Sequence, residues 1–110
     1  MSKKLEELNQ ILIKEQINEV SCSKLEPDFY KKTTKYKLNC QDNSEIKQID
    51  KILKRILEIR IGKLLTHIDI VDMRKIKDNL TDEECLFFEK ISNAQEILMN
   101  STLPEVLLNE

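Results

Sequence analysis

The order of hydrophobic and polar positions along the chain predicts a series of amphipathic helices. Apolar residues recur at intervals of three or four, the spacing of one face of an α-helix, and charged residues fill the positions between them. In the first stretch the apolar residues are Leu5, Leu8, Ile11 and Leu12. We predict helices over residues 3–19, 27–38, 44–68 and 82–99, with a weaker helix over 68–77.

The longest predicted helix, residues 44–68, carries an apolar stripe that is wider than one face. At about 1.5 Å per residue it would be roughly 37 Å long, which makes it the expected centre of the domain. A wide stripe is typical of a helix that contacts more than one neighbour. We therefore predict a possible subunit interface on this helix, formed by Ile49, Ile52, Leu53, Ile56 and Ile59.

Three sites carry signals for the beginning of a helix. Pro27 suits a first helical turn because its φ angle is fixed and it has no N–H. Asp42 with Glu45, and Thr81 with Glu84, have the spacing of capping boxes, in which two side chains satisfy free N–H groups reciprocally.

Composition narrows the fold class. The 110 residues include one glycine, which excludes a glycine-rich phosphate loop, and two prolines, too few turn formers for a many-stranded β fold. With 40% hydrophobic and 35% charged residues, the chain has the material for one core under a charged surface. We predict an all-α bundle of four to five helices around one long central helix, with a domain over 1–100 and a tail over 101–110.

The inventory of reactive side chains is small. His67 is the only histidine, and the three cysteines include no C-x-x-C pair, so we predict no enzyme activity, no cofactor and no metal. The cysteines are interpreted as free thiols in a reducing compartment. No apolar run approaches the ~18 residues of a membrane span, so we predict an intracellular protein without a membrane segment.

Charge is distributed unevenly along the chain. Residues 46–77 have a net charge of +5 and residues 78–110 a net charge of −7. These segments either pair within one fold or each face a partner, and the sequence leaves both open.

A basic stripe on the long helix is formed by Lys47, Lys51, Lys54 and Arg55. It suggests an alternative function as a DNA-binding helical dimer, although with few aromatic residues for base stacking direct nucleic-acid contact is disfavoured. An unrelated helical protein-interaction module is a third reading.

Three segments, in order, go beyond a generic helical pattern. They are 25–30 (LEPDFY), 58–65 (EIRIGKLL) and 80–84 (LTDEE). This ordered set resembles the helical A-domain of GINS proteins, in particular the archaeal subunit type in which that domain comes first. The residues of this chain that match the family motif are Leu25, Pro27, Asp28, Phe29, Tyr30, Arg60 and Lys63.

The resemblance implies a non-enzymatic scaffold in DNA replication. A GINS subunit of this type associates with other GINS subunits as a homo- or heterotetramer and links the MCM helicase to a RecJ-like or Cdc-type partner. The expected location is the cytoplasm, with the nucleoid, for an archaeal protein and the nucleus for a eukaryotic one. Leu64 stands where the family usually has isoleucine. Such subunits also carry a small β-rich B-domain, so residues 101–110 are expected to begin a linker to a B-domain that was truncated or is naturally absent.

The motif residues also have a physical reading of their own. Phe29 and Tyr30 are expected to be core anchors, with the tyrosine hydroxyl bonded to a polar partner. Arg60 and Lys63 share one face of the long helix among apolar neighbours, where an unpaired charge is costly. We predict that one of them pairs with Asp28 or Glu26.

Overall fold

The computed structural model describes residues 2–18, 21–66 and 76–102. Over these residues the chain forms four α-helices, one 3₁₀-helix and no strand, which confirms the all-α prediction. The elements are α1 (Lys3–Ile17), α2 (Phe29–Asn39), α3 (Asn43–Thr66), η1 (Lys77–Asn79) and α5 (Asp82–Thr102). The helix predicted over 68–77 lies almost entirely outside the described residues, as does most of the tail predicted over 101–110.

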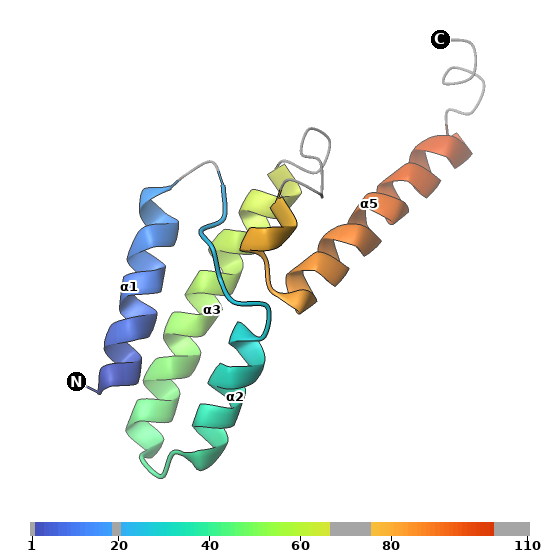
Figure 1. Ribbon diagram of the computed structural model, residues 1–110. Coiled ribbons are helices and arrows are strands. Elements are labelled where there is room, and N and C mark those ends of the chain that lie inside the picture. Colours follow the sequence, from blue (N-terminus) through green and yellow to red (C-terminus); the bar gives the residue numbers. More distant parts are fainter. Residues whose placement is uncertain (1, 19–20, 67–75, 103–110) are drawn as a thin grey trace.

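The long helix α3 is the centre of the arrangement (Figure 1). α1 runs beside it in the same direction, and α2 runs beside its first half in the opposite direction. The extended link 21–28 passes along α3 between the end of α1 and the start of α2. α5 begins against α3 on the side away from α1 and then slants outward.

The first two helices begin differently: α1 has a side-chain cap, whereas the N-cap side chain of α2 makes no capping hydrogen bond. Ser2 is the N-cap of α1 and accepts a hydrogen bond from the Leu5 N–H at 3.1 Å. Pro27 does not lie in the first turn of α2 as predicted, since the helix begins at Phe29 with Asp28 as its N-cap residue. The carbonyl of Pro27 instead accepts a hydrogen bond from the Asp82 N–H at 2.9 Å, which ties this bend to the start of α5.

One of the two predicted capping boxes is complete. The Thr81 N–H donates to Glu84 Oε1 at 3.0 Å, and the Glu84 N–H donates to Thr81 Oγ1 at 3.2 Å. At the start of α3 the Asp42 carboxylate accepts from backbone N–H groups. Glu45, its predicted partner, instead accepts a hydrogen bond from the Tyr36 hydroxyl at 2.9 Å. The second box is therefore only half formed.

Two apolar clusters form the core, and α3 contributes to both. The first joins α1, the link, α2 and α3 through Leu5, Leu8, Leu25, Phe29 and Ile49. The second joins the link, α3 and α5 through Cys22, Leu64, Leu80 and Phe88.

The core corrects the predicted subunit interface on α3. Ile49 and Ile56 are 0% exposed, so for these two residues the prediction is wrong: their side chains are already covered by the chain's own helices. Ile52, Leu53 and Ile59 are half-buried, and their contact with another subunit stays a prediction.

Candidate functional site

The second half of α3 places two cations in the interior of the protein. Arg60 is 0% exposed and Lys63 is buried, although the neighbouring core residues Ile56 and Leu64 are apolar. The helical spacing that carries the apolar stripe also carries Arg60 and Lys63 inward, because residues three and four apart share a face. Arg60 and Lys63 therefore extend the buried face of α3 with two positive charges.

Every N–H group of the Arg60 guanidinium has a partner. Nε and Nη2 donate to the two carboxylate oxygens of Glu84 at 2.6 and 2.7 Å, a bidentate arrangement. Nη1 donates to Glu15 Oε1 and to the Ser23 carbonyl, the latter at 2.7 Å. Nη2 also donates to the Asn79 carbonyl at 3.0 Å. The five donors of this planar fork thus connect α3 with α1, the link, η1 and α5.

Lys63 is held in the same way, one turn further along α3. Its Nζ donates to Glu15 Oε2 and to the Glu15 carbonyl, both at 2.7 Å, and to the Ser21 carbonyl at 3.1 Å. All three ammonium protons are therefore used. Glu15 accordingly bridges the two cations of α3.

The two carboxylates complete a neutral group of two cations and two anions. Glu15, 1% exposed, also accepts hydrogen bonds from the N–H and hydroxyl of Ser23. Glu84 also accepts from the Tyr30 hydroxyl at 2.6 Å. Among the described residues no buried side-chain nitrogen or oxygen lacks a hydrogen-bond partner. We call Glu15, Tyr30, Arg60, Lys63 and Glu84 the ionic hub.

Electrostatics in the hub favour the charged forms of Glu15 and Arg60 and the neutral form of Tyr30. Burial alone would raise the pKa of Glu15, but hydrogen bonds from Lys63 and Ser23 and the charge of Arg60 outweigh it, so this pKa is lowered from 4.5. Burial would lower the pKa of Arg60, and the hydrogen bonds and charge of Glu84 reverse the direction and raise it. Burial and the neighbouring Glu84 carboxylate raise the pKa of Tyr30, so its hydroxyl stays protonated as a donor.

The hub corrects the predicted pairing of Arg60 and Lys63. Neither contacts Asp28 or Glu26; their acidic partners are Glu15 and Glu84. The Asp28 carboxylate instead lies 3.4 Å from Lys32 Nζ at the surface of α2. The expectation for Phe29 and Tyr30 is confirmed: Phe29 lies in the core and the Tyr30 hydroxyl has a carboxylate partner.

Glu15 is the residue that the sequence analysis missed. It follows Leu5, Leu8 and Leu12 at the spacing of one helix face, so the core face of α1 ends in a carboxylate. A charge on a core stripe predicts a buried partner of opposite sign, because an unpaired buried charge is not tolerated. The position of Glu15 on the apolar face of α1 therefore indicated a buried ion pair.

The hub is built to hold helices together, since its donors are consumed by the protein itself. Cys22 lies beside it, and burial raises the pKa of this thiol to about 11, which keeps it protonated and a poor nucleophile. The three cysteines are free, as predicted. In the described part of the chain no three histidine, cysteine or acidic side chains are grouped so as to hold a metal ion. His67 lies outside that part.

The predicted basic stripe lies on the outer surface of α3. Lys47, Lys51, Lys54 and Arg55 are all exposed. Arg55 Nη1 lies 3.7 Å from Glu58, whereas the three lysines have no acidic partner within residues 2–18, 21–66 and 76–102. Between α3 and α5 the described residues form one ion pair, Arg60 with Glu84. The exposed charges of the cationic middle and the anionic end do not neutralise each other there.

Comparison with protein-family models, with curated proteins and with solved structures found no match to this chain. None of the described helices combines the length and the apolar character that crossing a membrane requires. The site is therefore interpreted from its own residues.

Proposed function

We propose that the chain is a non-enzymatic scaffold subunit of a GINS-type complex, which links the MCM replicative helicase to its partner proteins. One observation carries the proposal. The three segments of the family-like pattern, which are far apart in sequence, supply Tyr30, Arg60 and Glu84, and the Glu84 carboxylate accepts hydrogen bonds from both Tyr30 and Arg60. If the three short segments matched the family by chance, there would be no reason for their side chains to meet in the fold. The contact therefore supports treating the three segments as one family pattern.

The hub also suits a scaffold physically. Bidentate and fully paired contacts set distance and angle together, so they fix the placement of α1, α2 and α5 on α3. A scaffold needs such rigidity, because a partner that meets preorganised surfaces loses less conformational entropy on binding.

The experiment is co-elution of the purified chain with MCM helicase and other GINS subunits from the same organism. We expect a stable complex by size-exclusion chromatography with light scattering. The Tyr30→Phe variant should behave like the original chain, because Tyr30 acts inside the hub and not at the surface. Absence of any complex with folded chain and helicase at micromolar concentration overturns the proposal.

DNA binding is the second candidate, favoured by the three exposed lysines of α3 that have no acidic partner among the described residues. Fluorescence anisotropy with a labelled DNA duplex over a salt series distinguishes the two. A DNA-binding surface gives log K falling with log salt at a slope of about −0.9 per phosphate contacted, and Lys51→Glu with Arg55→Glu abolishes it. The scaffold proposal predicts negligible affinity for DNA in the original chain and in the double variant alike.

A further inference from the structure

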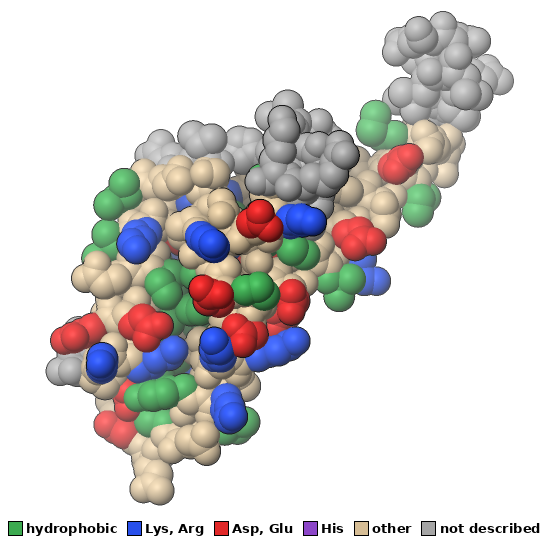
Figure 2. Space-filling model, viewed as in Figure 1, with side chains coloured by type: hydrophobic (Ala, Val, Ile, Leu, Met, Phe, Trp, Pro, Cys, Tyr) green, Lys and Arg blue, Asp and Glu red, His purple; other side chains and the backbone are tan. Residues whose placement is uncertain are grey.

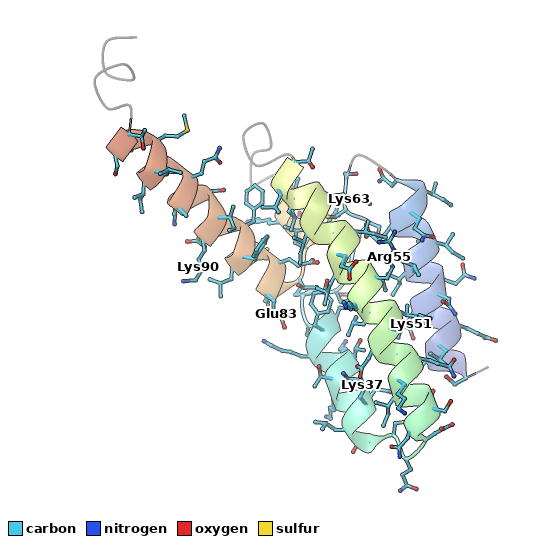
Figure 3. All side chains as sticks on the ribbon, turned by 180° about the vertical axis from the view of Figure 1, so that it is seen from behind. Lys37, Lys51, Arg55, Lys63, Glu83 and Lys90 are labelled. Atoms are coloured by element: carbon cyan, nitrogen blue, oxygen red, sulfur yellow. The ribbon has the colours of Figure 1, made fainter. Side chains whose placement is uncertain are left out.

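An open groove runs between α1 and the outer side of α3. It is lined by the apolar Leu12 and Ile52, by the basic Lys51, Lys54 and Arg55, and by one acid, Glu58, which lies 3.7 Å from Arg55. Figure 3 places Lys51 and Arg55 on α3 next to α1. A second hollow, which shares Arg55 with the first, lies further along α3 at Ile59, Gly62 and Thr66. The positions of α3 on this line are Gln48, Ile52, Arg55, Ile59, Gly62 and Thr66, alternately four and three residues apart, the spacing at which one helix packs along another.

Gly62, the only glycine of the chain, lies in this groove. A Cβ added there would meet nothing within 4 Å, so no contact inside the described structure requires glycine. Glycine within a helix is destabilising relative to alanine, because it loses more backbone freedom on folding. Its presence is explained if the backbone of another helix approaches α3 closely at this point.

The second half of α5 has exposed apolar side chains, although Ile91, Ser92 and Gln95 are half-buried. After Phe88 no residue of α5 is buried, and Ile97 and Leu98 are 65% and 66% exposed. A short helix is marginal in water unless its apolar face is covered. Leu86 and Ile97 are exposed and eleven residues apart, so they share one face of α5, and Glu89 and Glu96 lie beside that face. Figure 2 shows hydrophobic and acidic side chains close together along the outer part of α5.

Groove and helix do not meet within one chain. α5 lies across α3 from the groove, as the labelled Glu83 and Lys90 of α5 show against Lys51 and Arg55 (Figure 3). Their charges are nevertheless complementary: α5 has five acidic residues and one lysine, whereas Lys51 and Lys54 at the groove have no acidic partner in the described structure. Residues 89–102 would span about 21 Å, within the roughly 27 Å of groove between positions 48 and 66.

We propose that the groove between α1 and α3 receives the outer half of α5 from a second copy of the chain. The apolar side chains of α5 cover Leu12, Ile52 and Ile59, and Glu89 and Glu96 meet Lys51 and Lys54. If each copy gives its α5 to the other, the dimer closes with two-fold symmetry and leaves neither groove open. This deepens the proposed scaffold function and rests on it for its biological meaning.

Sedimentation equilibrium of the full chain tests the contact. We expect a dimer whose dissociation constant rises at least tenfold in Lys51→Glu/Lys54→Glu, and likewise in Glu89→Lys/Glu96→Lys. Mixing the two variants should restore association, because in the mixed dimer both contacts join opposite charges, one with the original signs and one with the signs reversed. Lys31→Glu/Lys35→Glu is the matched control: it makes the same charge change on exposed positions of α2 and should leave association unchanged.

Gly62→Gln separates the contact from folding. Glutamine favours the helix and should raise the unfolding midpoint of the monomer, while its side chain blocks the groove and weakens association at least tenfold.

Three outcomes overturn the inference. The first is a monomer at all concentrations, and the second is failure of the mixed variants to associate. The third is a dimer that the groove variants leave unchanged and that Leu98→Glu abolishes, because this result indicates pairing of α5 with α5. The helicase co-elution is scored separately. Helicase binding without self-association rejects this inference alone, and self-association without helicase binding rejects the proposed function alone.

Discussion

The two halves of α3 build two different kinds of core. The first half buries Ile49 in an apolar cluster with Leu8 and Phe29. The second half buries Arg60 and Lys63 against two carboxylates and several backbone carbonyls. Apolar burial is non-directional, so it holds α1, α2 and α3 together without strongly dictating their angles. The hub adds direction, because each of its hydrogen bonds has a required geometry.

The difference predicts how each half responds to substitution. An apolar core loses stability in proportion to the volume removed. A buried ionic group fails when one member is lost, because its partners stay buried and unpaired. The following variants test whether stability falls gradually on substitution in the first half of α3 and abruptly in the second half.

The largest effect is expected for Arg60→Met. It removes five hydrogen bonds and leaves Glu15 and Glu84 without their shared cation, at a cost of about 3–5 kcal/mol. Urea unfolding followed by circular dichroism measures the loss. Arg55→Met, at an exposed position of the same helix, should change stability by no more than about 0.5 kcal/mol. Equal losses of stability in Arg60→Met and Arg55→Met would contradict a special role for the buried arginine.

A graded loss is expected at Ile49. Ile49→Val should cost about 0.5–1.5 kcal/mol and Ile49→Ala about 2–5 kcal/mol, because more buried volume is lost at each step. By contrast, Arg60→Lys keeps the charge but not the fork, so it should still be strongly destabilising. Urea midpoints of the three variants provide the test, and a lysine tolerated at position 60 would contradict the directional role.

A smaller effect is expected for Tyr30→Phe. The hydroxyl donates to a charged acceptor, and such bonds contribute about 1.5–3 kcal/mol. Because Glu84 keeps Arg60 and the Thr81 N–H as partners, we expect a loss near the lower end, about 1.5 kcal/mol. Thermal unfolding measures it, with Tyr36→Phe at the exposed end of α2 as the control.

The smallest effect concerns acid stability. The pKa of Glu15 is lower in the folded protein than its ordinary 4.5, so its contribution is present above pH 4.5 and is lost as pH falls through the folded value. The difference in unfolding free energy between the original chain and Glu15→Gln should therefore shrink below pH 4.5. For the exposed Glu6→Gln the difference should stay small at every pH.

Much of the fold followed from the sequence pattern, whereas the site followed only in part. The periodicity of apolar residues located α1, α2, α3 and α5 to within a few residues, because it records which face each helix buries. That Arg60 and Lys63 need acidic partners also followed, since they lie on a core face. The identity of those partners did not, because Glu15 is 45 residues from Arg60 and reaches it only through the packing of α1 on α3.

The central claim is that Arg60 and Glu84 act as one unit that fixes α5 on α3, and a double-mutant cycle tests it most directly. Urea unfolding of Arg60→Gln, Glu84→Gln, the double variant and the original chain gives the coupling free energy. We predict a coupling of at least about 2 kcal/mol, because either single change strands a buried charge and the double change removes both. A coupling below about 0.5 kcal/mol would contradict the account.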